Sequence, residues 1–443
     1  MRTKSGLCLE FTASCVAFSL FACGGAHSPT SAAPPADPPS SSSDLSTVNA
    51  GDYRTLDDAL SACPANGPCT INFPSGNWNT TYYASNRCIS RSNLSLLGLT
   101  APYLDSNTAP TRIVGGAVVQ PGLAFCGASN ITIQGIGFDD GPAYFAATGI
   151  ATDGLQFTGK TGAPPDPLVT NIAVSHSIAL GPASNAPLHG ILFDHVNGVS
   201  TYDTTAVFFA DCTVIRSENV EAWEVRGTGC ANEGVLIQSD GYTAVSNAFL
   251  NGGSVGALIS GDTESGFVVD AEGPNGISKV TLQGLSSSGV RFGFKLLNNS
   301  VVANGLTGIG MNRDGAVLQN LSVGAVSACL LSQSSSNQVA QVNVMSFTCT
   351  NNTGLPAVPL EIDNDWTGGS SISSWMALDG GQCSELGGFL SILGWSDLGT
   401  TSTVPTFCTH DASTSVTVSG YLSTRGNVPF ADLYPGSVIQ ILP

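Results

Sequence analysis

The chain has 443 residues, of which 42% are hydrophobic and only 10% charged, so it is long enough to bury one large core or two modest ones. Its 14 basic residues are outnumbered by 32 acidic ones, and the formal net charge of -18 argues against nucleic acid or an anionic membrane surface as the main partner. The 52 glycines between short apolar runs are typical of a β-rich, extracellular protein.

The segment 1–22 has the features of an export signal. Arg2 and Lys4 precede an apolar run that is too short to span a bilayer, and the run LFAC ends at Cys23. LFAC resembles the lipobox of bacterial lipoproteins, which implies that residues 1–22 are removed and that Cys23 is acylated. A plain secretory signal cleaved nearby is the alternative. Both readings predict export, either to the cell envelope as an outer-membrane or cell-surface lipoprotein or as a secreted protein.

Residues 23–44 form a predicted tether. The segment is rich in Pro and Ser and contains nothing to bury. A chain of this composition stays extended and unpacked, so it would hold a folded domain away from a membrane surface.

Ten cysteines remain when the signal and Cys23 are set aside. An even number of cysteines in an exported chain indicates disulfides. Spacing alone leaves their connectivity open, although several separations in chain order approximate one repeat of the coil derived below. Pairing in chain order gives Cys63–Cys69, Cys88–Cys126, Cys212–Cys230, Cys329–Cys349 and Cys383–Cys408. A zinc site is disfavoured because no C-x-x-C occurs.

A short amphipathic helix is predicted in residues 55–64. Apolar residues recur with helical spacing from Leu56, and Thr55 and Asp58 are placed as a capping box. The segment 70–74 that follows alternates like a strand. A helix laid over such a strand would cover the open apolar end of a stack of coils.

The motifs G-D-Y-x-T-L-x-x-A-L and I-x-F-P-x-G-x-W, between Gly51 and Trp78, resemble the N-terminal cap of the right-handed parallel β-helix superfamily, which includes pectate lyases, polygalacturonases and phage tailspikes. The resemblance implies an all-β, single-stranded solenoid with a capping helix over residues 45–390. Beyond the resemblance, the sequence of residues 391–443 predicts terminal coils or a small C-terminal β cap. The motif says almost nothing about the reaction.

An internal repeat supports this fold. The segments CTVIRSEN, GVLIQSDG and GALISGDT begin at residues 212, 234 and 256. A period of 22 held over three copies predicts coils of about 22 residues. Residues separated by one period would then lie one strand spacing from each other on successive coils.

That period predicts a ladder of three carboxylates, Glu218, Asp240 and Asp262. Close negative charges raise each other's pKa unless a cation or a shared proton relieves them, which predicts a Ca²⁺ site at these residues. Asp240 and Asp262 could equally be the catalytic carboxyl pair of a glycosidase. The plainer alternative is that all three are turn residues bonded to their own backbone.

Basic residues form a second predicted ladder. Arg291 and Arg313 are also separated by one period, and Lys295 shares the strand parity of Arg291. These candidate catalytic residues could bind an anionic group, or abstract the proton α to a uronic carboxylate as lyases of this superfamily do. Neutralisation by acidic neighbours such as Asp270 is the alternative.

Further residues are predicted to bind substrate. Arg226 and Asp270 are separated by two of the predicted periods, so they would lie two coils apart at equivalent positions. Glu224 would lie beside Arg226. Tyr242 and Trp223 could stack on sugar rings, although Trp223 could equally belong to the core.

Two other patterns carry no prediction. His189 and His195 are too far apart along one strand to share a metal ion. The polygalacturonase signature is incomplete, because its Asn-x-Asp, Gly-His-Gly and Arg-x-Lys elements are all missing, so its catalytic roles are not transferred.

The sequence therefore predicts an exported β-helix that acts on polysaccharide through residues 216–314. The expected activity is that of a lyase or a glycoside hydrolase for a uronate-containing glycan. The alternative is a non-catalytic, glycan-binding or adhesin-like surface protein. A tailspike-like trimer is disfavoured by the lipobox, and no nucleic-acid partner is expected.

Overall fold

The part of the chain that the computed structural model describes belongs to the unit Ser43–Pro443. Every strand pairing in it is parallel. No helix among the described residues is long and apolar enough to cross a bilayer. The described residues are 45–80, 88–99, 109–115, 122–139, 153–159, 169–181, 188–239, 243–257, 263–271, 277–297, 301–304, 307–309, 328–333, 342–350, 358–363, 370–378, 383–399, 402–409, 414–426, 429–431 and 435–442.

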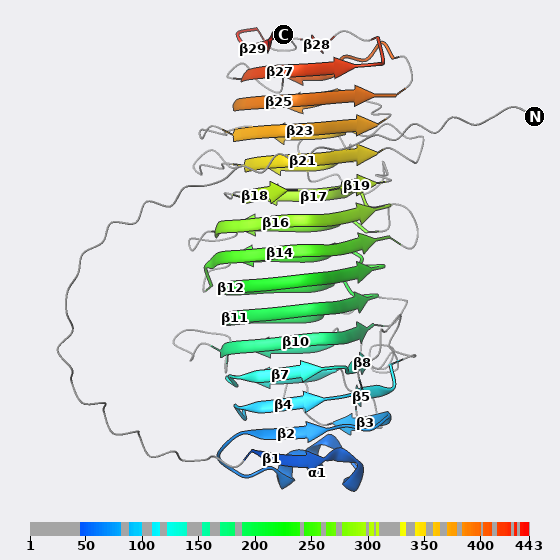
Figure 1. Ribbon diagram of the computed structural model, residues 1–443, viewed down its shortest axis with the longest axis vertical. Coiled ribbons are helices and arrows are strands. Elements are labelled where there is room, and N and C mark those ends of the chain that lie inside the picture. Colours follow the sequence, from blue (N-terminus) through cyan, green and yellow to red (C-terminus); the bar gives the residue numbers. More distant parts are fainter. Residues whose placement is uncertain are drawn as a thin grey trace, which may run out of the picture. The chain divides into compact units, whose positions relative to one another are not determined.

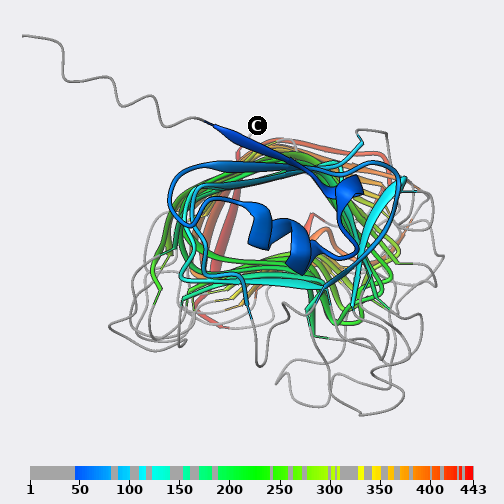
Figure 2. The same ribbon diagram turned by 90° about the horizontal axis from the view of Figure 1, so that it is seen from below.

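The predicted cap is present at the start of this unit. It consists of β1 (Ser46–Asn49), the 3-10 turn η1 (Ala50–Asp52) and α1 (Leu56–Ala62). The Thr55 side chain accepts a hydrogen bond of 3.1 Å from the backbone N–H of Asp58, which caps α1. Figure 2 shows α1 lying across the area that the first coils enclose, with its apolar side buried.

The strands after the cap stack coil upon coil (Figure 1). This arrangement is the right-handed parallel β-helix that the sequence predicts. The strands are β2 (Cys69–Asn72), β3 (Gly76–Thr80), β4 (Leu94–Leu97), β5 (Thr111–Gly115), β6 (Leu123–Cys126), β7 (Ile131–Gln134), β8 (Gly137–Asp139), β9 (Leu155–Thr158), β10 (Val169–Leu180), β11 (His189–Val207), β12 (Asp211–Thr228), β13 (Glu233–Ser239), β14 (Val245–Gly256), β15 (Ser265–Ala271), β16 (Ile277–Ser288), β17 (Phe292–Leu297), β18 (Val301–Asn304), β19 (Thr307–Ile309), β20 (Ala328–Gln333), β21 (Val342–Thr350), β22 (Val358–Asp363), β23 (Ser370–Leu378), β24 (Ser384–Leu386), β25 (Phe389–Leu398), β26 (Phe407–Thr409), β27 (Ser415–Ser423), β28 (Phe430–Ala431) and β29 (Val438–Leu442).

The coils turn at residues with positive φ. The first corner is mostly asparagine, with φ from 54° to 59°, because asparagine tolerates the left-handed region when its side chain bonds locally. Gly198 on β11 and Lys279 on β16 take the same place in their coils. A second corner follows further along each coil. The first corner contains Asn130, Asn171, Asn219 and Asn247, and the second contains Gly135, His176, Asp203, Glu224 and Gly252.

Two faces of the coil matter for the site. The first face is formed by the segments 189–194, 211–216, 233–238, 265–270 and 292–297. The second face is formed by the short stretch between the two corners in each coil, such as 199–202 and 220–223.

Inward-pointing side chains fill the space between the faces. Phe125, Phe157 and Phe193 stack on three successive coils of the first face, with ring centroids 5.0 and 5.3 Å apart. Buried and less buried residues alternate in strands such as β7 and β9, as the sequence patterns predict. Strands of the first face such as β13 are buried at consecutive positions, and Leu192, Val214, Leu236 and Val268 form a second apolar cluster.

The coil length is not constant, so the single period predicted from the repeat is wrong for much of the chain. Thr213 pairs with Val235 at the predicted spacing, but Val235 pairs with Phe267 and not with Ala257. Val301 pairs with Val342, at almost twice the predicted spacing. The strands keep their register while the connections between them differ in length, because insertions at a turn leave the stacked strands undisturbed.

These unequal coils contradict the single period on which the predicted ladders rest. Glu218 lies opposite Ser246 and not opposite Asp240. Phe294 lies opposite Leu330, well beyond one period, so a residue one period after Arg291 is not its neighbour on the next coil.

Five disulfides link the described coils. They join the ten cysteines in chain order, as Cys63–Cys69, Cys88–Cys126, Cys212–Cys230, Cys329–Cys349 and Cys383–Cys408. The expectation of disulfides is met, and each bond closes a loop within one coil or between neighbouring coils.

Candidate functional site

A row of ionisable side chains crosses the first face at the start of its strands. His189 pairs with Asp211, and the register of the following residues places Asp153 before His189 and Glu233 after Asp211. Successive members are therefore one strand spacing apart, ~4.8 Å between backbones. We call Asp153, His189, Asp211 and Glu233 the ionisable row.

His189 occupies a defined position between two carboxylates. Its Nδ1 lies 2.8 Å from Oδ1 of Asp153, which also accepts the backbone N–H of His189 at 3.2 Å. Its Nε2 lies 3.6 Å from Oδ2 of Asp211. The side chains of His189, Asp153 and Asp211 are 16%, 6% and 15% exposed, so the group is largely shielded from solvent.

Glu233 has a strongly perturbed carboxyl group. Burial is the largest cause, and a side-chain hydrogen bond with Asp211 and the negative charges of Asp211 and Glu264 act in the same direction. Together they raise the pKa of Glu233 from 4.5 to about 9, although the charge of Lys295 opposes them. Glu233 is therefore protonated at neutral pH.

A cation lies beside the ionisable row. Nζ of Lys295 donates to Oε1 of Glu264 at 3.3 Å and sits 5.7 Å from the ring centroid of Phe292. The Lys295 side chain is 12% exposed. Arg291 belongs to the predicted basic ladder and is close to Lys295 in sequence, and the residue is buried, at 9% exposed.

The row brings together a protonated carboxyl group, a second carboxyl group and an imidazole. A carboxyl group that keeps its proton beside other polar groups is suited to general acid chemistry. Within the described part of the chain, no three His, Cys, Asp or Glu side chains are grouped so as to hold a metal ion.

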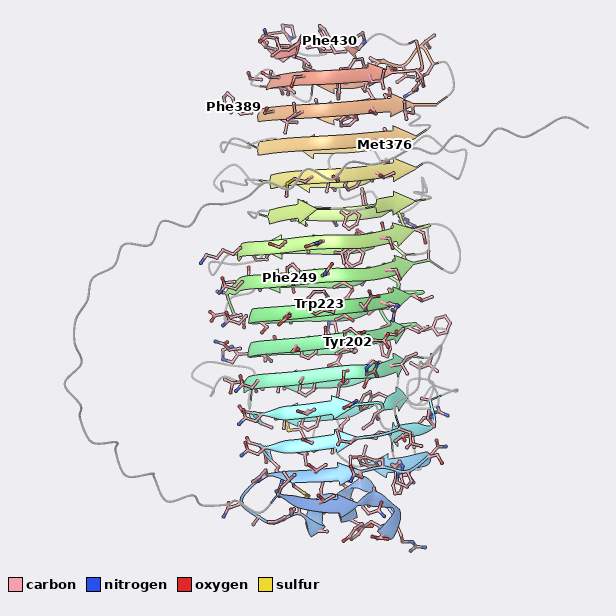
Figure 3. All side chains as sticks on the ribbon, in the orientation of Figure 1. Tyr202, Trp223, Phe249, Met376, Phe389 and Phe430 are labelled. Atoms are coloured by element: carbon pink, nitrogen blue, oxygen red, sulfur yellow. A yellow bond between two sulfur atoms is a disulfide. The ribbon has the colours of Figure 1, made fainter. Side chains whose placement is uncertain are left out.

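Exposed aromatic side chains lie on the second face. Tyr202 and Trp223 are paired in register on β11 and β12 and are 50% and 36% exposed. Phe249 on β14 contacts Trp223 edge to face, with ring centroids 5.6 Å apart. Figure 3 shows the three rings on successive strands. Trp223 is thus a surface residue, not a core residue.

The second corner gathers the predicted residues Glu224 and Arg226. Arg226 bonds Asp203 and, at 2.9 Å, Oε2 of Glu224, and Nδ1 of His176 lies 3.0 Å from Asp203. Burial raises the pKa of Asp203, but the hydrogen bonds and charges of Arg226 and His176 outweigh it and lower the pKa below its usual value.

Asp270 lies elsewhere than the sequence predicts. It pairs with Gln238 on the first face, whereas Arg226 pairs with Ser254 beyond the second corner. The predicted Arg226–Asp270 register is wrong because the coils between them differ in length.

Glu218 belongs to the first corner. Its Oε2 accepts a hydrogen bond of 3.2 Å from Nδ2 of Asn197. The remaining predicted site residues lie outside the described residues, namely Cys23, Asp240, Tyr242, Asp262 and Arg313.

Sequence reasoning missed most of the ionisable row. His189, Asp211 and Glu233 follow one another at the predicted period, which fails further along the chain but holds here. Counting that period from His189 leads to Asp211 and then to Glu233, so it would have found three of the four members of the ionisable row. Asp153 carries no such signal, because its separation from His189 is much longer than one period.

Comparisons with known proteins give similar folds at low identity. No protein-family model matches the chain, and no curated protein does. The catalytic domain of Agl-KA matches 94% of this chain and 70% of its own, with a TM-score of 0.48 and 12% identity. The catalytic domain of a GH87 alpha-1,3-glucanase in complex with tetrasaccharides matches 90% of this chain and 70% of its own, with a TM-score of 0.49 and 10% identity. A family 28 exopolygalacturonase of Yersinia enterocolitica matches 90% and 78%, with a TM-score of 0.37 and 13% identity.

Proposed function

We propose that this β-helix cleaves the glycosidic bonds of a polysaccharide at the ionisable row. The observation that carries the proposal is the adjacency of Glu233, whose pKa is raised to about 9, to the carboxyl group of Asp211. A carboxyl group that stays protonated at neutral pH can donate its proton to the oxygen of a leaving sugar.

The neighbouring groups have complementary roles in this proposal. Asp211 acts as the base or nucleophile, because a glycosidase needs a second carboxylate beside the acid. His189 is a positioning residue, since it bridges Asp153 and Asp211 at 2.8 and 3.6 Å. Asp153 fixes the ring from the far side, as the third group of a catalytic triad does.

The favoured substrate is a glycan that contains uronate. Lys295 lies beside the row and can attract a sugar carboxylate, with Glu264 as its partner in the free protein. The same cation favours a lyase as the second candidate reaction, because proton abstraction α to a carboxylate requires its charge to be neutralised.

Product analysis distinguishes the two reactions. The protein is incubated with acidic and neutral polysaccharides, and new reducing ends and the ultraviolet absorbance of unsaturated ends are both followed. Reducing ends without absorbance indicate a hydrolase, and absorbance indicates a lyase. Glu233→Gln is expected to lower the rate of hydrolysis by ~10²- to 10⁴-fold, while Glu218→Gln on the first corner serves as the matched control.

A non-catalytic, glycan-binding protein is the alternative function. The observation that favours it is the exposure of Tyr202 and Trp223 on the second face, since exposed rings bind sugars without chemistry. Binding to a polysaccharide that the protein leaves uncleaved, in a panel that includes acidic glycans, would establish this alternative.

Calcium stays a proposal for Asp240 and Asp262. Glu218 lies opposite Ser246, and Asp240 and Asp262 lie outside the described residues. The polysaccharide assay is therefore run with and without a chelator, and activity that falls on chelation and returns with Ca²⁺ would support the site.

We further propose export and attachment through a lipid on Cys23. Five disulfides among the described coils support an oxidising compartment, because such bonds are rare in the reducing cytosol. Labelling of expressing bacteria with palmitate is expected to mark the protein and not its Cys23→Ala variant. If neither the unchanged protein nor the variant is labelled, the protein is secreted without a lipid anchor.

A further inference from the structure

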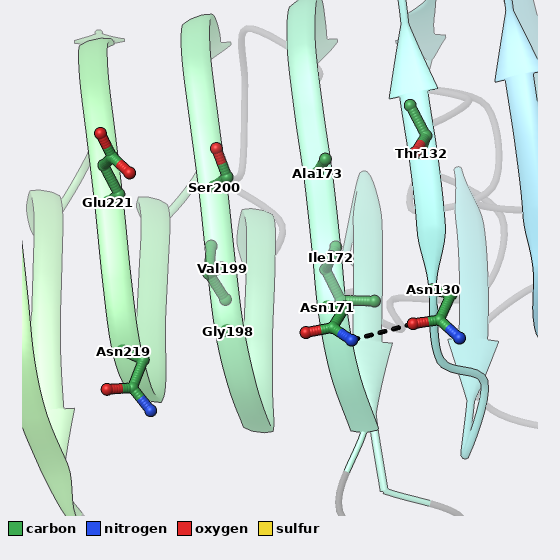
Figure 4. Close-up of a pocket in the computed structure, with 10 residues that line it drawn as sticks. All are labelled: Asn130, Thr132, Asn171, Ile172, Ala173, Gly198, Val199, Ser200, Asn219 and Glu221. Carbon is green, nitrogen blue, oxygen red and sulfur yellow. Dashed lines mark hydrogen bonds between the residues drawn. The ribbon is translucent and has the colours of Figure 1, made fainter. Parts of the chain in front are cut away.

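The second face contains an open hollow of about 490 Å³ next to its aromatic side chains. Figure 4 shows the two rows that line it, one of asparagines along the first corner and one of outward residues on the neighbouring strand position. The outward row starts with the small side chains of Thr132, Ala173 and Ser200. Glu221 and Phe249 continue the same row, so the surface rises where the hollow ends.

Asparagine amides form one wall of the hollow. Nδ2 of Asn171 donates to Oδ1 of Asn130 at 2.9 Å, and Asn130 donates in the same way to Asn93 at 2.8 Å. Each of these bonds uses one of the two N–H groups and one of the two lone pairs of an amide, and the side chains are exposed. Donors and acceptors therefore recur on the coils of Asn93, Asn130 and Asn171, while Gly198 takes this place on the next coil.

Aromatic rings stand at the end of the hollow. The indole N–H of Trp223 donates to Oε1 of Glu221 at 2.9 Å, and Phe249 packs against the ring edge to face at 5.6 Å. These contacts hold the indole in place, and Tyr202 lies beside it on the preceding coil. A fixed aromatic ring next to amides is the combination that recognises a sugar, whose faces are apolar and whose edges carry hydroxyl groups.

The charge of the surface selects among sugars. Of the ten described residues that line the hollow, Glu221 is the only ionisable one. None of these described lining residues is basic, so a sugar carboxylate or sulfate would meet only repulsion from them. We propose that this hollow and its rings are a separate binding site for a neutral, hydroxyl-rich glycan chain that runs along the coils.

This site is distinct from the ionisable row because the two lie on different faces of the coil. The row belongs to the first face, where β11 begins at His189, whereas Tyr202 follows the first corner on the same strand. The protein would thus hold a neutral chain on one face while the other face acts on glycan. Binding here does not depend on the proposed reaction.

The test is titration of the full mature protein with neutral hexasaccharides of glucose, mannose and xylose and with an oligouronate, by calorimetry. One neutral hexasaccharide is expected to bind, and the oligouronate is not expected to bind at this face. Trp223→Ala and Ala173→Phe, which fills the hollow, should each weaken that binding by ~10-fold or more. Glu233→Gln should bind as the unchanged protein does.

Two controls keep folding defects apart from lost binding. Met376→Ala removes an exposed apolar side chain on β23, outside the site, and should leave affinity unchanged. Each variant must also keep the thermal midpoint of the unchanged protein, which Trp223→Ala should do because it truncates a side chain at the surface. The inference is overturned if no neutral glycan binds or if Trp223→Ala and Ala173→Phe both bind normally. Binding that Glu233→Gln alone abolishes would also overturn it and leave the proposed activity standing.

Discussion

Glu233 differs from the other acidic residues of this acidic protein through its surroundings. It begins β13 on the first face, beside Asp211 in the strand register, and two carboxyl groups so placed cannot both ionise readily. Burial is the largest cause of the raised pKa, the neighbouring carboxyl groups add to it, and Lys295 only partly offsets it. The chemistry proposed for the ionisable row thus depends on one residue whose proton is retained by its neighbours.

The pKa of Glu233 predicts how stability depends on pH. Between 4.5 and about 9 the folded protein keeps a proton that the unfolded chain releases. The contribution of Glu233 to stability is therefore complete below pH 4.5 and is lost as the pH rises toward 9. Glu233→Gln stays neutral at every pH, so its thermal midpoint should fall less steeply between about pH 5 and pH 9.

Glu218→Gln is the control, because it removes a carboxyl group on the first corner without touching the ionisable row. Melting curves at several pH values measure both variants. Identical pH slopes for Glu233→Gln and the unchanged protein would mean that Glu233 is ionised in the folded state, which would remove the basis of the proposed acid.

At the scale of an element, the corner asparagines combine two requirements. Asn219 has φ of 55°, and its amide donates to Asn197 at 2.8 Å and accepts from Asn247 at 3.0 Å. The backbone must turn sharply there so that the strand can pass from one face to the next. The side chain then ties three successive coils together.

Asn219→Ala should destabilise the protein by ~2–3 kcal/mol, since it loses both amide bonds and forces a Cβ-bearing residue into the left-handed region. Asn219→Gly loses the same bonds without that backbone cost, and should be more stable than the alanine variant by ~1 kcal/mol. Urea unfolding measures the difference. An alanine variant as stable as the glycine variant would show that backbone strain is not a factor at this corner.

The last coils contain a buried ionic network. Nη1 of Arg425 lies 3.3 Å from both carboxylate oxygens of Asp397, and Oγ1 of Thr406 donates to Oδ2 of Asp397 at 2.7 Å. Asp397 lies on β25 and Arg425 follows β27, so the network joins two paired strands of the stack. Both charged side chains are buried, which makes each dependent on the other.

Asp397→Asn should cost about 3–5 kcal/mol of unfolding free energy, because it leaves the buried guanidinium of Arg425 without its counter-charge. The double variant Asp397→Leu/Arg425→Met removes both charges, and we expect it to be more stable than the single variant. Urea unfolding of the two variants tests this expectation. A double variant less stable than Asp397→Asn would indicate that the pair itself stabilises the fold.

For the whole unit Ser43–Pro443, stability is distributed along the stack. Each coil contacts mainly the coils before and after it, as the pairings of β11 with β10 and β12 illustrate. The five disulfides are spread along the chain from Cys63 to Cys408. They therefore constrain the unfolded chain in several separate loops.

Loop length should set how much each disulfide contributes. Cys88–Cys126 spans 38 residues and Cys63–Cys69 spans 6. Restricting the longer loop removes more entropy from the unfolded chain, so replacing Cys88 and Cys126 by Ser should cost ~1.5 kcal/mol more than replacing Cys63 and Cys69. Thermal unfolding of the two double-serine variants measures this difference in stability. Fully reduced protein gives the loss of stability when every disulfide is absent. Equal losses would indicate that native contacts, and not loop closure, dominate.

The cap, the parallel coils and the presence of disulfides could be predicted from local sequence. Helical spacing from Leu56, the capping pair at Thr55 and the alternation within strands such as β7 are set by residues close in the chain, and the structure keeps them. The regular spacing of His189, Asp211 and Glu233 was also present in the sequence.

Only the tertiary structure decided which distant residues meet. Glu218 lies opposite Ser246, and Arg226 lies opposite Ser254 and away from the strand position of Asp270, because the connections between strands differ in length and no local sequence pattern reveals those lengths. The raised pKa of Glu233 likewise depends on burial and on charges from two neighbouring coils. Local sequence determined the strand and its faces, whereas the stacking of unequal coils determined the neighbours across them, and those neighbours set the chemistry of the ionisable row.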